Sequence, residues 1–306
     1  MIVKVGKGRQ EIDMYYELSG QGKRKVLFIM GFTSTCCQWK NTVRMLNERG
    51  GYECCIFDNR GVGHSGQPRG LYTTKLMARD TYELLQHLGW TEDICIVACS
   101  MGGFIAQELC LLAPKHTFKA IIMTSTASSP PMSIPPITTL LKLMIHKKGT
   151  KGVDARIRAE VAASLLIPPA WGAQPVEPHL KTASPDAMTN VEAIVQMLMY
   201  EAATKPPQSQ AGYRGQFNAV FFHNVSPKRL RKLGTLSHFL VMAGSVDRIL
   251  WPRNAAIIAR HMKCKRILFE GKGHALHHEL GDEFIDIVTS HFDSAFSELS
   301  EDKVQM

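Results

Sequence analysis

The 306-residue sequence contains no apolar stretch that approaches the roughly 20 residues a membrane-spanning helix needs. Its strongest apolar run, Val26 to Met30, has the length of a strand. The first residues, from Met1 to Gly8, also lack the apolar core of a secretory signal. We therefore expect neither a membrane span nor export.

The eight cysteines include no C-x-x-C pair, which is the spacing typical of zinc sites and thiol redox motifs. Two vicinal pairs are present, Cys36-Cys37 and Cys54-Cys55, and most of the cysteines lie in apolar runs. We interpret them as small buried hydrophobic residues. Unpaired thiols are typical of a reducing compartment, so the sequence predicts a cytoplasmic protein.

Recognition motifs for DNA or RNA are missing as well, although the formal net charge is +9. Basic residues are spread along the chain and cluster only at Lys228 to Lys232 and Lys263 to Arg266. We therefore expect no nucleic-acid partner. With 45% hydrophobic and 21% charged residues, the composition is that of a globular protein with a sizeable core.

Short β-rich runs alternate with helical patterns, which favours an α/β fold built on a mostly parallel sheet flanked by helices. Eight strands are predicted, the first two as a hairpin: 2–5, 14–18, 26–30, 54–57, 94–98, 120–123, 239–243 and 266–269. Helical spacing marks three further segments: Leu76 to Leu88, Phe104 to Leu112 and Phe284 to Phe292.

The alternation stops between about Ala127 and Thr235, where proline-punctuated helical patterns replace it. We interpret this interval as a helical cap, or lid, inserted after the sixth strand. The predicted organisation is therefore a core of residues 1–127 and 235–296, a cap of residues 128–234, and a flexible tail of residues 297–306.

A buried strand followed by small-x-Ser-x-Gly and then a helix, from Ile96 to Phe104, is typical of a nucleophile elbow. The turn holds Ser100 on a strained backbone, so its neighbours Ala98 and Gly102 must be small. Two alternatives compete. Ser100 could simply cap the helix, and Cys99 could be the nucleophile, although a strand-end side chain should point away from that of Ser100.

A serine hydroxyl needs a base within hydrogen-bond reach, and the base needs an acid to orient it. Asp247 follows the seventh strand and His274 follows the eighth, in the loops where α/β sheets bind ligands. The predicted catalytic residues are Ser100, Asp247 and His274. Asp58 is the rival acid, but it opens a glycine-rich turn after the fourth strand, where capping is the simpler role.

The oxyanion of an acyl-transfer intermediate needs two amide donors. The N–H of Met101, at the start of a helix, is one candidate, and Gly31 lets the loop after the third strand present the N–H of Phe32 as the other. His274, His277, His278 and Glu279 could also be imagined around a metal, but they lack the known zinc-protease spacing. We expect no metal and no cofactor.

Several of these segments together resemble the α/β-hydrolase family. They are Met30 to Thr33, Asp58 to Gly66, Ala98 to Gly103, Gly244 to Asp247 and Gly271 to His274. The stretch from Ser100 to Leu109 is most similar to the branch of enol-lactonases, small methylesterases and cofactor-free haloperoxidases. Met30 stands where the family usually has histidine, and Ala98 replaces the usual elbow glycine. A serine nucleophile argues against the epoxide-hydrolase and haloalkane-dehalogenase branches.

The resemblance implies hydrolysis of a small-molecule ester, with lactones, thioesters, lipids or carbon–carbon bonds as alternatives on the same residues. Caps of this fold line the acyl pocket, so we expect a medium-length apolar acyl or alkyl group bound by Trp171, Met144 and Phe221. Some relatives bind ligands without turnover. A weaker alternative is membrane attachment through apolar cap residues, and the sequence sets no oligomeric state.

Overall fold

All of the strands predicted from the sequence are present in the computed structural model, which describes residues 1–129 and 155–302. Their bounds are β1 Ile2–Val5, β2 Ile12–Ser19, β3 Arg24–Ile29, β4 Tyr52–Phe57, β5 Ile94–Cys99, β6 Phe118–Thr124, β7 His238–Gly244 and β8 Lys265–Phe269. Within the described residues they form one 8-stranded sheet in the order β1-β2-β4-β3-β5-β6-β7-β8. Only the β1/β2 and β2/β4 pairs are antiparallel. The predicted fold class is confirmed.

Side chains of the central strand β5 alternate between the two faces of the sheet, as the two-residue period of a strand requires. Ile94, Ile96 and Ala98 pack toward α2, α3 and α11, whereas Cys95 and Val97 pack toward α1 and α13. The bounds of these helices are α1 Lys40–Glu48, α2 Thr74–His87, α3 Met101–Leu112, α11 Arg253–Met262 and α13 Asp282–Asp302. Both faces of the sheet are therefore buried, which explains why these strands are apolar without interruption.

The helix ends follow local signals. The Thr73 hydroxyl accepts the Leu76 N–H at 3.1 Å where α2 begins, and Pro114 follows the end of α3. The last helix differs from the expectation of a flexible tail from residue 297, because α13 continues to Asp302. Ala295 is buried and Phe296 packs against the core beside it, so these contacts hold the part of α13 that precedes residue 297.

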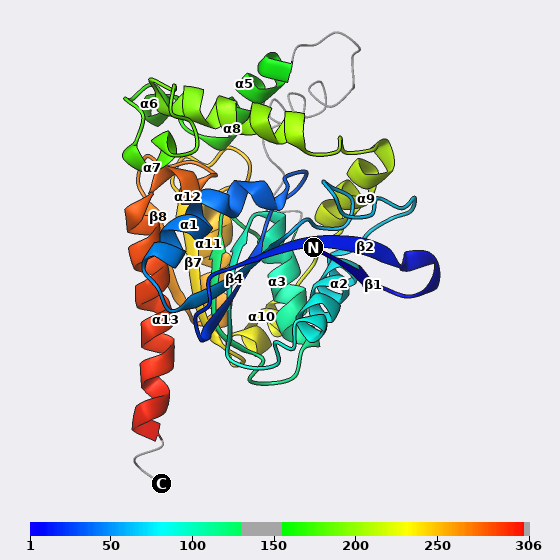
Figure 1. Ribbon diagram of the computed structural model, residues 1–306. Coiled ribbons are helices and arrows are strands. Elements are labelled where there is room, and N and C mark those ends of the chain that lie inside the picture. The colour runs from blue at the N-terminus through cyan, green and yellow to red at the C-terminus, as the bar shows by residue number, and fades with distance from the viewer. Residues whose placement is uncertain (130–154, 303–306) are drawn as a thin grey trace.

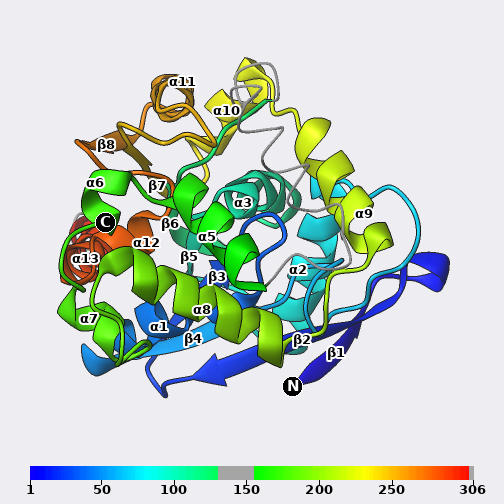
Figure 2. The ribbon, with the colours of Figure 1, turned by 90° about the horizontal axis from the view of Figure 1, so that it is seen from above.

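Six helices lie between β6 and β7 in the described part of the chain, and they supply the predicted cap. They are α5 Ala155–Leu166, α6 Pro169–Gly172, α7 Pro178–Lys181, α8 Asn190–Thr204, α9 Gln210–Phe221 and α10 Pro227–Leu233. Figures 1 and 2 show α5, α6, α7 and α8 grouped at one end of the molecule, while α10 lies low beside α3. Leu230 and Leu233 of α10 are buried in the main core, so the chain has already returned to the core before residue 234.

The cysteines are all free thiols, and every one except Cys37 and Cys264 is buried. This agrees with their interpretation as small hydrophobic residues. Within residues 1–129 and 155–302, no helix combines the length and the apolar character that crossing a bilayer requires.

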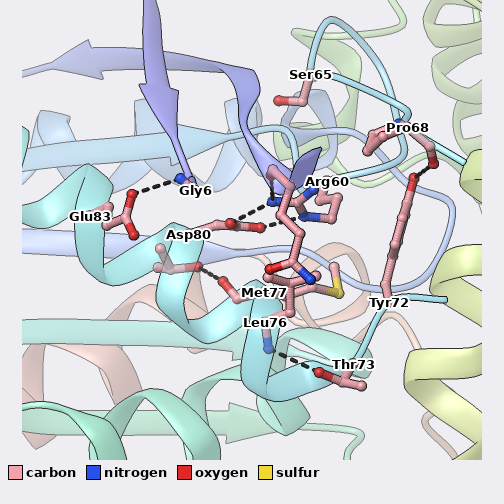
Figure 3. A network of polar contacts seen from close by, with 12 residues as sticks. Gly6, Arg60, Ser65, Pro68, Tyr72, Thr73, Leu76, Met77, Asp80 and Glu83 are labelled. Carbon is pink, nitrogen blue, oxygen red and sulfur yellow. Dashed lines mark hydrogen bonds and ion pairs between the residues drawn. The ribbon is translucent and has the colours of Figure 1, made fainter. Parts of the chain in front are cut away.

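A buried ion pair ties the loop after β4 to α2 (Figure 3). The Arg60 guanidinium donates two hydrogen bonds of 2.7 Å to the Asp80 carboxylate, and a third of 2.8 Å to the Gln10 carbonyl. Both side chains are 1% exposed. Burial raises the pKa of Asp80, and the Arg60 hydrogen bonds oppose that shift. The pair thereby fixes one end of the 58–66 loop.

We predict that Asp80→Asn lowers the free energy of unfolding by about 3–5 kcal/mol, because the Arg60 charge would stay buried without a counter-charge. The matched control is Glu160→Gln, which breaks the exposed Arg156–Glu160 pair on α5 and should cost no more than about 0.5 kcal/mol. Urea denaturation of both variants measures the difference. Equal losses in the two variants would contradict the structural role of the buried pair.

Candidate functional site

Ser100 joins β5 to α3 in a backbone conformation, φ 57° and ψ −120°, that residues with a side chain rarely adopt. Such strain costs about 1–3 kcal/mol and persists only when neighbouring contacts hold it. The Ser100 N–H donates to the Thr124 carbonyl at 3.0 Å, and the Ser100 carbonyl accepts from the Thr126 hydroxyl at 2.8 Å. Within the described helix α3, the Ser100 hydroxyl makes no capping bond, so the alternative role as a helix cap is wrong.

Small residues around Ser100 are a steric requirement. A Cβ on Gly102 would come within 2.1 Å of the Ile29 carbonyl oxygen, and a Cβ on Gly103 within 2.3 Å of the Thr126 hydroxyl. Position 102 therefore has no room for a side chain. Ala98, in place of the usual glycine, is a residue of β5 and is fully buried in the core. The position two residues after Ser100 therefore needs glycine, whereas the position two residues before it accommodates alanine.

His274 and Asp247 are in direct contact, although 27 residues separate them in the sequence. The His274 Nδ1 lies 2.8 Å from one Asp247 carboxylate oxygen, and both side chains are buried. The other oxygen accepts the N–H groups of Ile249 and Leu250 at 2.8 and 3.0 Å. Because a carboxylate only accepts hydrogen bonds, Nδ1 carries the proton and Nε2 is left with its lone pair.

Ser100 and His274 line one cavity of about 50 Å³. Apolar walls come from Met30, Leu166 and Leu198. The structure therefore gathers the three predicted catalytic residues at one place: two of them face the same cavity, and the third holds the imidazole from behind.

Cys99, the rival nucleophile, is buried on β5 among residues that pack toward α1 and α13. It also touches the wall of the cavity. Burial raises the pKa of its thiol to about 12, which keeps the sulfur protonated and unreactive.

The loop after β3 brings the predicted oxyanion residues to the serine. A Cβ on Gly31 would lie 3.0 Å from the Ser100 Cβ, so the Gly31 backbone passes directly beside the hydroxyl. Phe32 follows, its ring packed against Tyr213 and Phe217 of α9. Met101 is the first residue of α3, as the elbow motif predicts.

Asp58, the rival acid, holds this loop instead of touching His274. Its two carboxylate oxygens accept the Cys36 N–H at 2.8 Å and the His64 N–H at 2.9 Å. The role expected from the sequence, capping of a turn, is confirmed. Next to it, the Asn59 amide donates to the Met30 carbonyl at 2.9 Å, which fixes the position where the family usually has histidine.

Residues of the cap hold three parts of the site. The Leu166 carbonyl at the end of α5 accepts the His274 N–H at 2.9 Å. Gln216 of α9 accepts the Thr33 N–H at 2.9 Å, and Glu201 of α8 accepts the Thr35 N–H at 2.7 Å. The cap therefore positions both the histidine loop and the loop after β3.

Glu279 fixes the histidine loop from the core side. Both of its carboxylate oxygens lie within hydrogen-bond distance of the Gly273 N–H, at 3.0 and 2.9 Å. Burial raises the pKa of Glu279 to about 7, although the Gly273 hydrogen bond and the nearby Lys272 oppose the shift.

Two of the residues predicted to bind substrate, Trp171 and Phe221, do not line the cavity that Ser100 and His274 share. Trp171 of α6 is buried in the cap's own core among residues of α5 and α8, and Phe221 is 48% exposed on α9, stacked on Phe217. Neither lines the cavity, whose cap residues are Leu166 and Leu198. Apolar character alone did not distinguish cap packing from pocket lining. Met144 lies outside the described residues.

Four polar residues that also line the cavity were not predicted as substrate contacts. They are Ser34, Gln38, His277 and His278. The two histidines follow His274 by three and four positions, so a short helix, α12 Leu276–Glu279, carries them into the same site. The spacing of these two histidines from His274 was the signal in the sequence that could have identified them as cavity residues. Among the described residues, no group of three or more His, Cys, Asp or Glu side chains is arranged to hold a metal ion.

Comparison with known proteins gives partial sequence matches and a whole-chain structural match. A candidate non-heme bromoperoxidase of Mycobacterium tuberculosis is 36% identical over 117 residues, which is 37% of this chain and 42% of that protein. The 2-hydroxy-6-oxononadienedioate/2-hydroxy-6-oxononatrienedioate hydrolase of Paraburkholderia xenovorans is 27% identical over 145 residues, or 46% of this chain and 50% of the relative. The matches thus span about half the length of these relatives or less.

The fold is shared over nearly the whole chain with a thermophilic esterase from Thermogutta terrifontis, at a TM-score of 0.72 and 21% identity, covering 96% of this chain and 99% of the esterase. The family model described as alpha/beta hydrolase fold matches residues 25–279, which include Ser100, Asp247 and His274. The chain therefore belongs to the α/β-hydrolase family.

Proposed function

We propose that this chain is a serine hydrolase that cleaves carboxylic esters through an acyl-enzyme on Ser100. The observation that carries the proposal is the 2.8 Å contact between His274 and Asp247, behind a cavity that His274 shares with Ser100. A buried carboxylate that orients an imidazole toward a serine on a strained turn is the arrangement that activates a hydroxyl.

In the proposed reaction, His274 Nε2 takes the Ser100 proton as the serine oxygen attacks the ester carbonyl. The tetrahedral intermediate collapses, the carbon–oxygen bond to the alcohol breaks, and His274 returns the proton to the leaving alcohol. A water molecule, deprotonated by the same nitrogen, then attacks the acyl carbonyl, the bond between the acyl carbon and Ser100 Oγ breaks, and His274 returns the proton to Ser100 Oγ as the acid leaves. Asp247 keeps the imidazole in one tautomer throughout and stabilises its charged form.

The oxyanion is assigned in this proposal to the backbone N–H groups of Phe32 and Met101. Support comes from the Gly31 backbone, which passes beside the Ser100 hydroxyl, and from the start of α3 at Met101, where helix amides and the helix dipole favour negative charge. Asn59 and Asp58 keep the loop in place through the Met30 carbonyl and the Cys36 N–H.

The group next to the reacting carbonyl is proposed to be apolar where it contacts Met30, Leu166 and Leu198. Hydrolysis of a carbon–carbon bond is the second candidate, because the Paraburkholderia relative is named for the hydrolysis of an oxo-dienedioate. Rates of hydrolysis measured for a panel of short p-nitrophenyl esters and for a vinylogous 1,5-diketone distinguish ester hydrolysis from carbon–carbon bond hydrolysis.

We predict that a fluorophosphonate probe forms a covalent adduct on Ser100, located by mass spectrometry of the digested protein. Ser100→Ala should abolish the adduct and lower ester turnover by at least about 10³-fold, since the residual rate would come from binding alone.

Ser164→Ala, a serine exposed on α5 away from the cavity, is the matched control and should label like the wild type. Absence of any adduct on the wild-type protein would favour a ligand-binding role over an enzyme.

The loop that carries His274 should make stability depend on pH through Glu279. The pKa of this residue is about 7 in the folded chain and about 4.5 in its ordinary range. The folded state therefore binds the proton more tightly than the unfolded state does. The contribution of the protonated Glu279 carboxyl to the free energy of unfolding is fully present below about pH 4.5, and it is lost as the pH rises through about 7.

We therefore predict that Glu279→Gln flattens the fall in the free energy of unfolding between about pH 5 and pH 8. Urea titrations at several pH values provide the measurement. Glu283→Gln, which removes a surface carboxyl of α13 without touching the His274 loop, is the control. Identical pH curves for wild type and Glu279→Gln would show that the buried carboxyl does not titrate in this range.

A further inference from the structure

Helix α9 exposes its large aromatic residues and buries its small or polar ones. Its buried residues are Gly212, Gly215, Gln216 and Ala219. Phe217 and Phe221, four residues apart on the opposite face, are 42% and 48% exposed, and Phe222 just after the helix is 69% exposed. A surface helix normally turns its apolar face toward the core. An exposed apolar cluster of this kind is typical of a surface that binds an apolar partner.

Close packing of the backbone prevents α9 from turning the aromatic face inward. A Cβ on Gly212 would come within 2.3 Å of the Gly61 carbonyl oxygen, and a Cβ on Gly215 within 2.4 Å of the Tyr72 ring. The Asn218 amide also donates to the Tyr72 carbonyl at 2.8 Å. The buried face therefore has no room for a phenylalanine, and Figure 2 shows α9 at the outer edge of the molecule.

The exposed rings contact one another and extend from the loop beside Ser100. The centroids of Phe217 and Phe221 are 6.0 Å apart in a stacked pair, and those of Phe221 and Phe222 are 5.1 Å apart. Phe32, in the loop after β3, has its ring centroid 6.5 Å from that of Phe217. Since Phe217 and Phe221 stack on each other, their faces are poorly placed to stack on nucleic-acid bases.

The chain around the aromatic face carries positive charge without negative charge. Between Ala202 and Val246, the sequence has no aspartate or glutamate but six basic residues: Lys205, Arg214, Lys228, Arg229, Arg231 and Lys232. The segment from Asn59 to Arg79, against which α9 packs, also lacks acidic residues. An acid-free basic surface attracts an anionic partner.

Basic side chains lie next to the exposed rings. Lys75 is exposed at the start of α2 and lines the same surface hollow as Phe222. Arg214 is exposed on α9, seven residues before Phe221 and so on the same face of the helix. Glu108 also lines the hollow, but its carboxylate accepts hydrogen bonds of 2.9 and 2.6 Å from Arg229, which neutralise it.

We propose that the aromatic face of α9, with the basic residues around it, binds the surface of an anionic lipid membrane. Phenylalanine rings enter the boundary between headgroups and acyl chains, where interfacial helices bury apolar side chains. Lysine and arginine side chains attract the anionic headgroups. Apolar insertion and charge attraction together hold the protein on one side of the bilayer. This attachment is independent of the ester hydrolysis proposed at Ser100.

Flotation of the intact protein with lipid vesicles tests the attachment. At about 0.1 M salt, the protein should float with vesicles of phosphatidylcholine and phosphatidylserine, and much less with phosphatidylcholine alone. Raising the salt to about 0.5 M should weaken binding, because the charge attraction is screened. Absence of flotation with the anionic vesicles, or equal flotation with both kinds, would overturn the proposal.

Replacement of exposed rings tests which surface binds. Phe221→Ser together with Phe222→Ser should lower the partition coefficient on anionic vesicles by at least about 10-fold, because the apolar contact is lost. Met188→Ser is the control: this residue is 74% exposed between α7 and α8, and Figure 2 shows α7 and α9 on opposite sides of the molecule. Urea denaturation checks that both proteins stay folded. Equal losses of binding in the two proteins would contradict docking through α9.

Removal of single charges tests the electrostatic part. Lys75→Gln should weaken binding to anionic vesicles by about 5-fold at low salt. Lys115→Gln is the matched control, since this exposed lysine lies between α3 and β6, at the edge of the sheet opposite the start of α2. It should bind like the wild type. The same loss in both variants would mean that net charge alone drives binding, and would overturn the assigned surface.

Two other occupants of the surface are distinguished by the same proteins. Light scattering would detect a dimer that the Phe221→Ser, Phe222→Ser protein cannot form, and fluorescence anisotropy would detect binding of labelled single-stranded DNA. We expect a monomer that binds vesicles more tightly than DNA. Either a dimer lost in the double variant or DNA binding, without flotation of the wild type, would assign the surface to that partner and overturn membrane attachment.

Discussion

The strained backbone at Ser100 is the constraint on which the rest of the site depends. A residue with φ of 57° persists there only because Thr124 and Thr126, at the end of the neighbouring strand, bind its N–H and carbonyl, and because Gly102 and Gly103 leave room for β3 and Thr126. Parallel pairing places the ends of β3, β5 and β6 at the same edge of the sheet. The turn therefore aligns the serine with the loop that passes beside it.

The cap is part of the scaffold of this site as well as a cover for it. Leu166, Glu201 and Gln216 come from three different cap helices, and each binds a backbone N–H of a loop that borders the cavity. Glu201 also sets the orientation of Gln38 and, through it, the tautomer of His278. Long loops have many conformations, and ordering them costs conformational entropy. Contacts that hold the loops in place before substrate binds reduce that cost for binding and catalysis.

The sequence predicted the sheet, both helical layers and the placement of Ser100, Asp247 and His274, because strand periods, elbow glycines and loop positions are local signals that the fold preserves. Cap contacts were harder to predict: Trp171 is as apolar as a pocket residue but packs within the cap. The polar lining of the cavity could not be recognised, because His278 lies beside Gln38 only through tertiary packing of residues far apart in the sequence.

In the proposed reaction, the Ser100 hydroxyl attacks while backbone amides receive the developing negative charge. A crystal structure of the protein inhibited by a small phosphonate would show both features together. We expect a covalent bond from Ser100 Oγ to phosphorus, with one phosphonyl oxygen about 2.7–3.1 Å from the N–H groups of Phe32 and Met101. A phosphonate bound to another residue, or an oxygen pointing away from those two amides, would contradict it.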